Sequence, residues 1–232
     1  MKFSVAIPFR DRGRDRNRPA NLKRVVEHWR DVGVEPRVVS DGRSGDEQFC
    51  RSAAYNIAAR EIDADILVYS ESDLIVPFEQ ILEGVELAAS APGLVVPFSR
   101  FMAVEPRDSE MVRQHLIHPV TAFSQQVRGN CQSIGAVNIV SRASIDAIGQ
   151  WPEEFEGAWF DDDACERAFQ ICCGATRFID GDAYHLYHLP GAQGEHLTDA
   201  DRAATAANQA RFELYCQAET AERIRELTAG GR

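Results

Sequence analysis

The sequence predicts an α/β fold with a mostly parallel central sheet that is flanked by helices. Short apolar runs, of the kind that form strands buried on both faces, alternate with helical patterns through the first half of the chain. This alternation is typical of right-handed βαβ units. Of the 232 residues, 44% are hydrophobic and 26% are charged, a balance that supports a packed core and argues against a disordered chain.

The first half contains the clearest elements. We expect buried strands at Phe3–Ile7, Arg37–Ser40, Asp65–Ser70 and Gly93–Pro97. Helical patterns lie between them, at Asn21–Val32, Asp46–Ile62 and Phe78–Ser90. Ligands of such sheets bind beyond the carboxyl ends of the strands, so we expect chemistry in the loops that follow Ile7, Ser40 and Ser70.

The second half is less regular. Its pattern predicts a short helix and a loop within Pro106–Thr121, a strand at Gly135–Val140, a helix at Asp161–Cys173, short strands at Thr176–Ile179 and Ala183–Tyr187, and one long helix over Thr198–Thr228. No repeat or linker interrupts the chain, so we expect a single domain over residues 1–232.

The formal net charge of −11 limits the partners. An acidic protein repels a phosphate backbone, so we expect no nucleic-acid partner. A small phosphorylated ligand remains compatible, because a bound divalent cation can supply positive charge locally. No apolar stretch is long enough to span a bilayer and no secretory signal is present, so we expect a cytoplasmic protein without a membrane span. For the same reason we expect the six cysteines to be buried free thiols.

An arginine-rich motif, Pro8-Phe9-Arg10-Asp11-Arg12, directly follows the first predicted strand. Arginines at a strand end can bind phosphate or ribose oxygens through forked hydrogen bonds. The alternative is a basic surface loop, because Arg14, Arg16 and Arg18 continue the charge run.

Two further motifs have the chemistry of a metal site. Glu71-Ser72-Asp73 follows the third strand, where its carboxylates can hold a cation and a ribose hydroxyl, with Asp73 as the direct ligand. His185 and His188 lie in one short segment, and imidazole nitrogens suit Mn²⁺ better than Mg²⁺. The alternatives are a solvated turn for the acids and ordinary hydrogen-bonded residues for the histidines.

Three acids, Asp161-Asp162-Asp163, open the helix predicted after Trp159-Phe160. Helix capping and the helix dipole explain one or two acids in a first turn. A carboxylate here could also accept the proton of an attacking hydroxyl, and the dipole would keep it ionised.

In their order along the chain, these motifs resemble the β1,4-galactosyltransferases and the related polypeptide N-acetylgalactosaminyltransferases, from Phe3 to about Pro190. The family's PFRxR motif corresponds to Pro8–Arg12, and its F-x-R-[AS] helix start corresponds to Phe49-Cys50-Arg51-Ser52. Its D-x-D metal motif, followed by Leu-Ile, reads Glu71–Ile75 here, and its E-D-D-D reads Phe160–Asp163. Glu therefore replaces the first metal-motif Asp, and Phe160 replaces a Glu that grips the acceptor in the family.

The resemblance implies the GT-A fold of nucleotide-diphospho-sugar transferases. It further implies a glycosyltransferase that uses Mn²⁺ or Mg²⁺ to move a hexose or N-acetylhexosamine from a UDP-sugar to an acceptor hydroxyl. A carboxylate base favours inversion of the sugar's configuration, but the related N-acetylgalactosaminyltransferases retain it on a similar scaffold, so the motifs leave both outcomes open. The acceptor, whether protein, glycan or lipid, is not specified by these motifs. Residues 1–100 would then form the nucleotide-binding half, residues 101–197 the acceptor half and residues 198–232 a C-terminal helix, with Pro190–His196 as a lid.

The resemblance also assigns roles to individual residues. The implied nucleotide contacts are Pro8, Phe9, Arg10, Arg12, Phe49, Arg51, Glu71, Ser72 and Asp73, with Asp41 added because its strand-end position contacts uracil in many GT-A enzymes. The implied metal ligands are Asp73, His185 and His188, the implied base is Asp161 or Asp162, and the implied acceptor or sugar contacts are Gly135, Trp159 and Phe160.

Two other classes of protein share part of this pattern. A nucleotidyltransferase also combines a parallel sheet with metal carboxylates, but normally has a glycine-rich phosphate loop after the first strand. Here that loop is rich in arginine and contains only Gly13. A non-catalytic nucleotide- or sugar-binding module would bind UDP without metal-dependent turnover.

Overall fold

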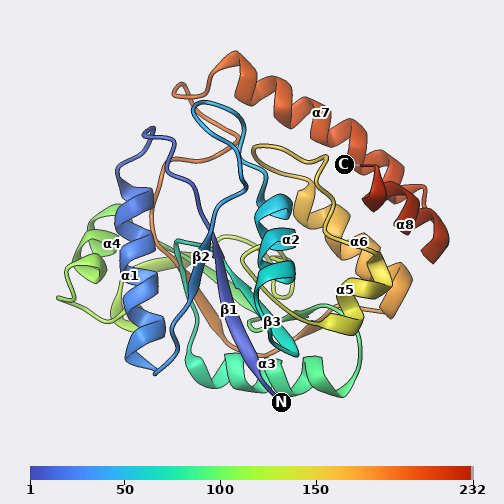
Figure 1. The fold of residues 1–232 in the computed structure, drawn as a ribbon. Helices are drawn as coiled ribbons and strands as arrows, with labels where there is room; N and C mark the ends of the chain where they lie inside the picture. Colours follow the sequence, from blue (N-terminus) through green and yellow to red (C-terminus); the bar gives the residue numbers. More distant parts are fainter. Residues whose placement is uncertain (231–232) are drawn as a thin grey trace.

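The computed structural model describes residues 1–230, which form two sheets surrounded by helices (Figure 1). The larger sheet has the strand order β2-β1-β3-β8-β5-β9. Its strands are β1 (Phe3–Pro8), β2 (Arg37–Val39), β3 (Ile66–Ser70), β5 (Val95–Val96), β8 (Val137–Ser141) and β9 (Arg177–Phe178). Neighbouring strands are parallel except that β8 runs antiparallel to β3 and β5. The predicted mostly parallel sheet is therefore confirmed, with one reversed strand.

Helices cover both faces of this sheet (Figure 1). One face packs against α1 (Asn17–Asp31) and α3 (Phe78–Ser90), which meet where the rings of Trp29 and Phe78 lie 6.5 Å apart. The other face packs against α2 (Arg51–Glu61) and α5 (Arg142–Ile148), and α6 (Asp161–Cys173) packs against α5. There Tyr55, Tyr69, Trp151 and Phe169 form a buried aromatic cluster. Burial of each such side chain contributes about 1.5–3 kcal/mol.

The remaining helices lie further out. The short helix α4 (Pro106–Arg113) packs against α1, and a 3₁₀ turn spans Pro119–Thr121. At the C-terminal end, α7 (Asp199–Cys216) and α8 (Ala221–Ala229) pack on α6 (Figure 1). No helix among the described residues is both long enough and apolar enough to cross a bilayer.

A second, four-stranded sheet was not predicted. Its order is β4-β10-β6-β7, and its strands are β4 (Leu74–Ile75), β6 (Arg100–Val104), β7 (Ser124–Gln126) and β10 (Asp182–His185). The sheet begins directly after β3, so the loop carrying Glu71–Asp73 joins the two sheets. This arrangement brings the end of β3 next to β10, more than a hundred residues later in the chain.

Several element boundaries differ from the prediction. The long helix predicted over Thr198–Thr228 is two helices, because α7 ends before Gln217 and the Thr220 side chain caps α8 by accepting from Arg223 N. The helix predicted from Asp46 begins only at Arg51, where Cys50 is the cap. The six cysteines are free as expected, but only Cys50 and Cys165 are buried, whereas Cys172 and Cys173 are half-buried and Cys131 and Cys216 are exposed.

Candidate functional site

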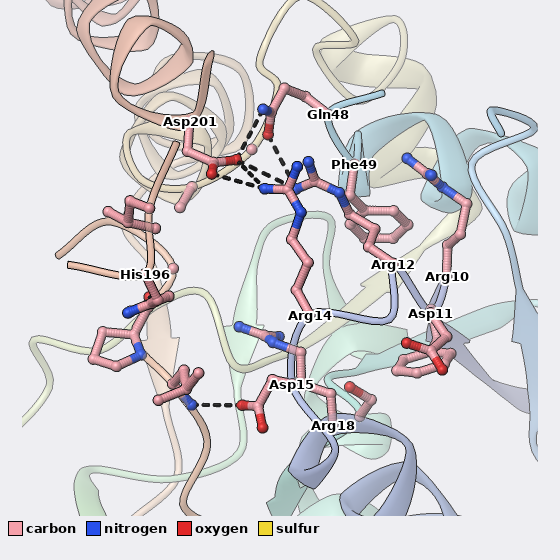
Figure 2. A pocket seen from close by; sticks show the side chains of 18 of the residues that line it. Arg10, Asp11, Arg12, Arg14, Asp15, Arg18, Gln48, Phe49, His196 and Asp201 are labelled. Atoms are coloured by element: carbon pink, nitrogen blue, oxygen red, sulfur yellow. Dashed lines mark hydrogen bonds and ion pairs between the residues drawn. The ribbon is translucent and has the colours of Figure 1, made fainter. Parts of the chain in front are cut away.

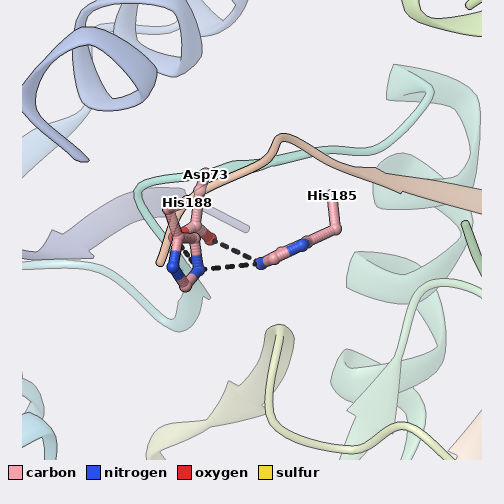
Figure 3. Close-up of side chains that lie close together, drawn as sticks. All are labelled: Asp73, His185 and His188. Atoms are coloured by element: carbon pink, nitrogen blue, oxygen red, sulfur yellow. Dashed lines mark hydrogen bonds and ion pairs between the residues drawn. The ribbon is translucent and has the colours of Figure 1, made fainter. Parts of the chain in front are cut away.

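Asp73, His185 and His188 form a compact cluster that joins the two sheets (Figure 3). One nitrogen or oxygen of each residue lies within 4.8 Å of the other two. His188 Nε2 is 3.1 Å from Asp73 Oδ2, and His185 Nε2 is 3.6 Å from Asp73 Oδ1. The antiparallel pairing of β4 with β10 sets this geometry, since His185 is opposite Leu74 and Leu186 N donates to the Asp73 carbonyl at 2.8 Å.

The segment after β10 is fixed by contacts with three other elements. Tyr187 N donates to Ser109 Oγ at 2.8 Å, and Leu189 N donates to Asp15 Oδ2 at 2.6 Å. The buried Asn21 amide donates to the Tyr187 carbonyl at 3.2 Å. These bonds hold His188 in place, so the cluster does not depend on a free loop.

The hydrogen bonds of the cluster orient its donor atoms. His188 Nδ1 lies 2.7 Å from the Leu189 carbonyl, which can only accept, so Nδ1 carries a proton and Nε2 faces Asp73. Asp73 is 3% exposed, and its Oδ1 is buried without a hydrogen-bond partner among the described residues. A buried carboxylate oxygen without a partner is costly unless something else pairs with it. Two imidazole nitrogens and this carboxylate are a donor set that fits a divalent cation such as Mn²⁺.

Burial and the mutual interactions of these three side chains shift their pKa values. Burial would raise the pKa of Asp73, but the charges of His188 and His185 and the His188 hydrogen bond lower it below its usual value. Burial lowers the pKa of His185 to about 4, so this imidazole is neutral near pH 7. Burial would also lower the pKa of His188, but the Asp73 charge and hydrogen bond raise it above its ordinary value.

Figure 2 shows a pocket of about 190 Å³, which lies beside the cluster because Ser72 and Leu189, the chain neighbours of Asp73 and His188, line it. Its walls come from the loop after β1, the residues before α2, Ser72, the segment after His188 and the start of α7. The lining residues are Pro8, Phe9, Arg10, Asp11, Arg12, Arg14, Asp15, Arg18, Gln48, Phe49, Ser72, Gly157, Ala158, Leu189, Pro190, Gly191, His196, Leu197 and Asp201.

Six of the residues predicted to contact a nucleotide line this pocket, namely Pro8, Phe9, Arg10, Arg12, Phe49 and Ser72. Arg10 also holds the pocket wall, since it donates to Asp41 Oδ1 at 2.9 Å and to the carbonyls of Gly45 and Glu47 at 2.8 Å. The Asp41 side chain is fully buried and accepts Cys50 N at 2.9 Å. Asp41 therefore supports the wall and does not line the pocket.

Arg51 lies outside the pocket, at the centre of an acidic cluster. Its guanidinium donates to Asp161 Oδ2 at 2.9 and 2.5 Å, to Asp162 and to Glu71. It also donates to the Gly135 carbonyl at 2.9 Å. The predicted nucleotide contacts Arg51 and Glu71 and the predicted bases Asp161 and Asp162 are thus brought together, although they are far apart in sequence.

The geometry of this acidic cluster leaves little free space. A Cβ at Gly135 would overlap the Asp162 carboxylate, so this position requires the close approach that only glycine permits. Burial, together with the neighbouring carboxylates, raises the pKa of Asp162 well above its usual value, opposite to the effect expected from the helix dipole. Burial also raises the pKa of Glu71 to about 7, although Arg51 opposes the shift.

The two aromatic residues before α6 have left-handed backbone conformations, with φ of 72° at Trp159 and 70° at Phe160. Trp159 is 48% exposed, whereas the Phe160 ring packs against Phe212 of α7 with centroids 5.9 Å apart. Of these two predicted acceptor contacts, Trp159 is the one with a large free surface. Bulky residues with positive φ are strained and often mark functional sites.

Sequence reasoning missed one wall of the pocket, the start of α7. Asp201 caps α7 together with Thr198, and its carboxylate accepts from Arg14 at 2.8 Å and from Gln48 at 2.9 Å (Figure 2). The spacing of Thr198 and Asp201 was visible as a helix-start signal. Nothing in it indicated that the same carboxylate would meet a loop almost two hundred residues earlier in the chain.

No protein-family model and no curated protein sequence matches the chain. Solved structures share its fold at low sequence identity. GalNAc-T7, solved with UDP, GalNAc and Mn²⁺, superimposes with a TM-score of 0.54 at 13% identity, over 92% of this chain and 48% of that chain. A mutant of Drosophila β1,4-galactosyltransferase 7, solved with manganese, UDP-Gal and xylobiose, gives a TM-score of 0.53 at 13% identity, over 88% of this chain and 79% of that chain.

A third neighbour is glucosyl-3-phosphoglycerate synthase from Mycobacterium tuberculosis, solved with Mn²⁺, UDP and glucosyl-3-phosphoglycerate. It gives a TM-score of 0.50 at 15% identity, over 93% of this chain and 80% of that chain. The chain thus spans about half the length of one neighbour and about four fifths of the other two. The similarity is one of fold, and the predicted GT-A fold is confirmed.

Proposed function

We propose that the protein is a metal-dependent glycosyltransferase that moves a hexose or N-acetylhexosamine from a UDP-sugar to an acceptor hydroxyl. The observation that carries this proposal is the cluster of Asp73, His185 and His188 beside a pocket lined by arginines, in a chain with the GT-A fold. The three solved neighbours contain manganese together with UDP or UDP-Gal, which supports the same cofactor and donor here.

The pocket and the cluster would divide the binding of the donor. Phe9, Pro8 and Phe49 offer apolar surface for the uracil ring, and Ser72 lies between Glu71 and the metal ligand Asp73. The His185 and His188 imidazoles and the Asp73 carboxylate would hold Mn²⁺, which when bound neutralises charge on the diphosphate of the leaving UDP. In this assignment Arg10 and Asp41 shape the nucleotide pocket from behind.

The acidic cluster would supply the base. A carboxylate of Asp161 or Asp162 would accept the proton of the acceptor hydroxyl, while Arg51 fixes the orientation of both side chains. Trp159 offers an exposed face on which an acceptor sugar or aglycone can stack, and Gly135 leaves room for Asp162. Direct attack by the hydroxyl on the face opposite the leaving group inverts the configuration of the sugar.

The residues after the metal ligands would form a lid. Pro190, Gly191 and His196 line the pocket, and the imidazole of His196 bonds the Pro190 carbonyl at 2.8 Å. This assignment makes residues 1–100 the nucleotide half and residues 101–197 the acceptor half of one domain. A donor bound in the pocket would contact both halves through the lid.

Release of UDP from a panel of UDP-sugars in Mn²⁺ tests this function. One sugar should be hydrolysed slowly without acceptor, and both EDTA and Asp73→Asn should abolish its turnover. Asp63→Asn, which removes a fully exposed carboxylate near β3, should leave turnover unchanged. Pyrophosphate exchange without UDP-sugar hydrolysis would instead indicate a nucleotidyltransferase, and UDP binding without any turnover would indicate a binding module.

A further inference from the structure

Four arginines line the pocket, and the side chains of three of them already form hydrogen bonds with other residues of the protein. Arg10 bonds Asp41 and two backbone carbonyls. Arg12 donates to Gln48 Oε1 at 3.2 Å and to the Asp46 carbonyl at 3.0 Å. Arg14 donates to both oxygens of Asp201, at 3.0 and 2.8 Å. A ligand would have to break these bonds to use the three side chains fully.

Arg18 is the exception. Within residues 1–230 its guanidinium makes no hydrogen bond, and its single ion pair joins Nη1 to Asp73 Oδ2 over 3.9 Å. Its side chain is 40% exposed and lines the pocket next to the metal cluster. The Arg18 guanidinium therefore lies between the nucleotide pocket and Asp73.

The position of Arg18 in its helix is unfavourable for stability. It lies in the first turn of α1, which contains no acidic residue. The helix dipole makes this end positive, so a cation there destabilises the helix and an anion stabilises it. An anion bound beside Arg18 would relieve both this repulsion and the lack of a hydrogen-bond partner.

We propose that Arg18 binds the diphosphate of the donor and stabilises the leaving group. This inference rests on the proposed function. When the acceptor oxygen bonds to the anomeric carbon, the bond from that carbon to the diphosphate oxygen breaks and its electron pair stays on UDP. The acceptor proton passes to Asp161 or Asp162. The forked guanidinium of Arg18 donates to the diphosphate oxygens on which this charge develops.

The test compares Arg18→Gln with Arg16→Gln, which removes the same charge from an exposed position directly before α1 and outside the pocket. Calorimetry with Mn²⁺ present should show roughly ten- to a hundredfold weaker UDP binding for Arg18→Gln. Arg16→Gln should match the native chain within about twofold, and Arg18→Lys should lie between the two because it keeps the charge without the fork.

Binding of Mn²⁺ alone, followed by electron paramagnetic resonance, separates this role from a structural one. Loss of a cation near Asp73 should leave Mn²⁺ affinity unchanged or tighter in Arg18→Gln. Weaker Mn²⁺ binding would mean that Arg18 only holds Asp73 in place, and would overturn the inference. Equal UDP affinity in Arg18→Gln and the native chain would overturn it while leaving the proposed function intact. A native chain that binds no UDP with Mn²⁺ would overturn both.

Discussion

Two clusters of charged and polar side chains, the acidic cluster around Arg51 and the metal cluster around Asp73, differ in how completely their charges are paired. In the Arg51 cluster, Asp161, Asp162 and Glu71 all accept from one guanidinium. In the metal cluster, Asp73 faces two imidazoles and a distant Arg18, and its Oδ1 has no hydrogen-bond partner among the described residues.

The difference in charge pairing indicates that the two clusters have different functions. A cluster whose charges are paired internally holds its side chains in one orientation, as a base requires. A cluster with a buried, unpaired oxygen gains from binding a cation.

The largest effect should follow removal of the base. Asp161→Asn or Asp162→Asn should lower kcat by roughly 10²–10⁴-fold, because general-base catalysis typically contributes that much. The variant with the larger loss identifies the base. Both variants should still bind Mn²⁺ and UDP, since neither side chain lines the pocket. If neither variant changes kcat more than about threefold, the base lies elsewhere.

The two clusters should also respond differently in stability. Arg51→Gln removes the cation that pairs with three carboxylates. It should therefore reduce the free energy of unfolding, measured in urea titrations, by about 3–5 kcal/mol. Asp73→Asn removes a carboxylate that lacks full pairing. Without metal it should therefore reduce the free energy of unfolding clearly less than Arg51→Gln does. Arg30→Gln, which breaks an exposed pair with Glu35, is the control and should change little. Equal losses for Arg51→Gln and Asp73→Asn would remove the distinction between the clusters.

The smallest effect concerns pH. The raised pKa of His188 means that, without metal, its protonated form stabilises the fold fully below its ordinary pKa of about 6.5. This stabilisation is lost as the pH rises through the raised pKa. Mn²⁺ needs the neutral imidazole, so its affinity should rise through the same window, by up to about tenfold per pH unit, and then level off.

Calorimetric titration of Mn²⁺ at a series of pH values checks this pH dependence. His115→Gln removes an exposed imidazole that pairs with Glu27, and should show the same profile as the native chain. A Mn²⁺ affinity that does not vary with pH in this window would show that His188 is not a ligand.

The sequence was most informative where strands end in residues with distinctive chemistry. Asp73, His185 and His188 were each recognisable from their residue type and from their position beside an apolar run. Their meeting depends on the two-residue strand β4, which pairs with β10. A strand that short has no periodicity to detect, so the second sheet could not be predicted.

Contacts between residues that are distant along the chain could not be predicted from the sequence either. Arg51 was identified from its local motif, but its hydrogen bonds reach residues 84 and 110 positions away. In the sequence Arg18 looked like one member of a surface charge run. It differs from Arg10, Arg12 and Arg14 only because those three side chains form hydrogen bonds within the protein. Local patterns give residue chemistry, whereas the choice among possible partners is made by tertiary packing.

A crystal structure of the protein with UDP and Mn²⁺, in which anomalous scattering locates the metal, tests the metal assignment most directly. One strong anomalous peak should lie in contact with Asp73, His185 and His188, with the diphosphate between that peak and Arg18. A peak at Asp161 and Asp162 instead, or no peak at Asp73 with UDP bound, would show that Asp73, His185 and His188 do not hold the metal.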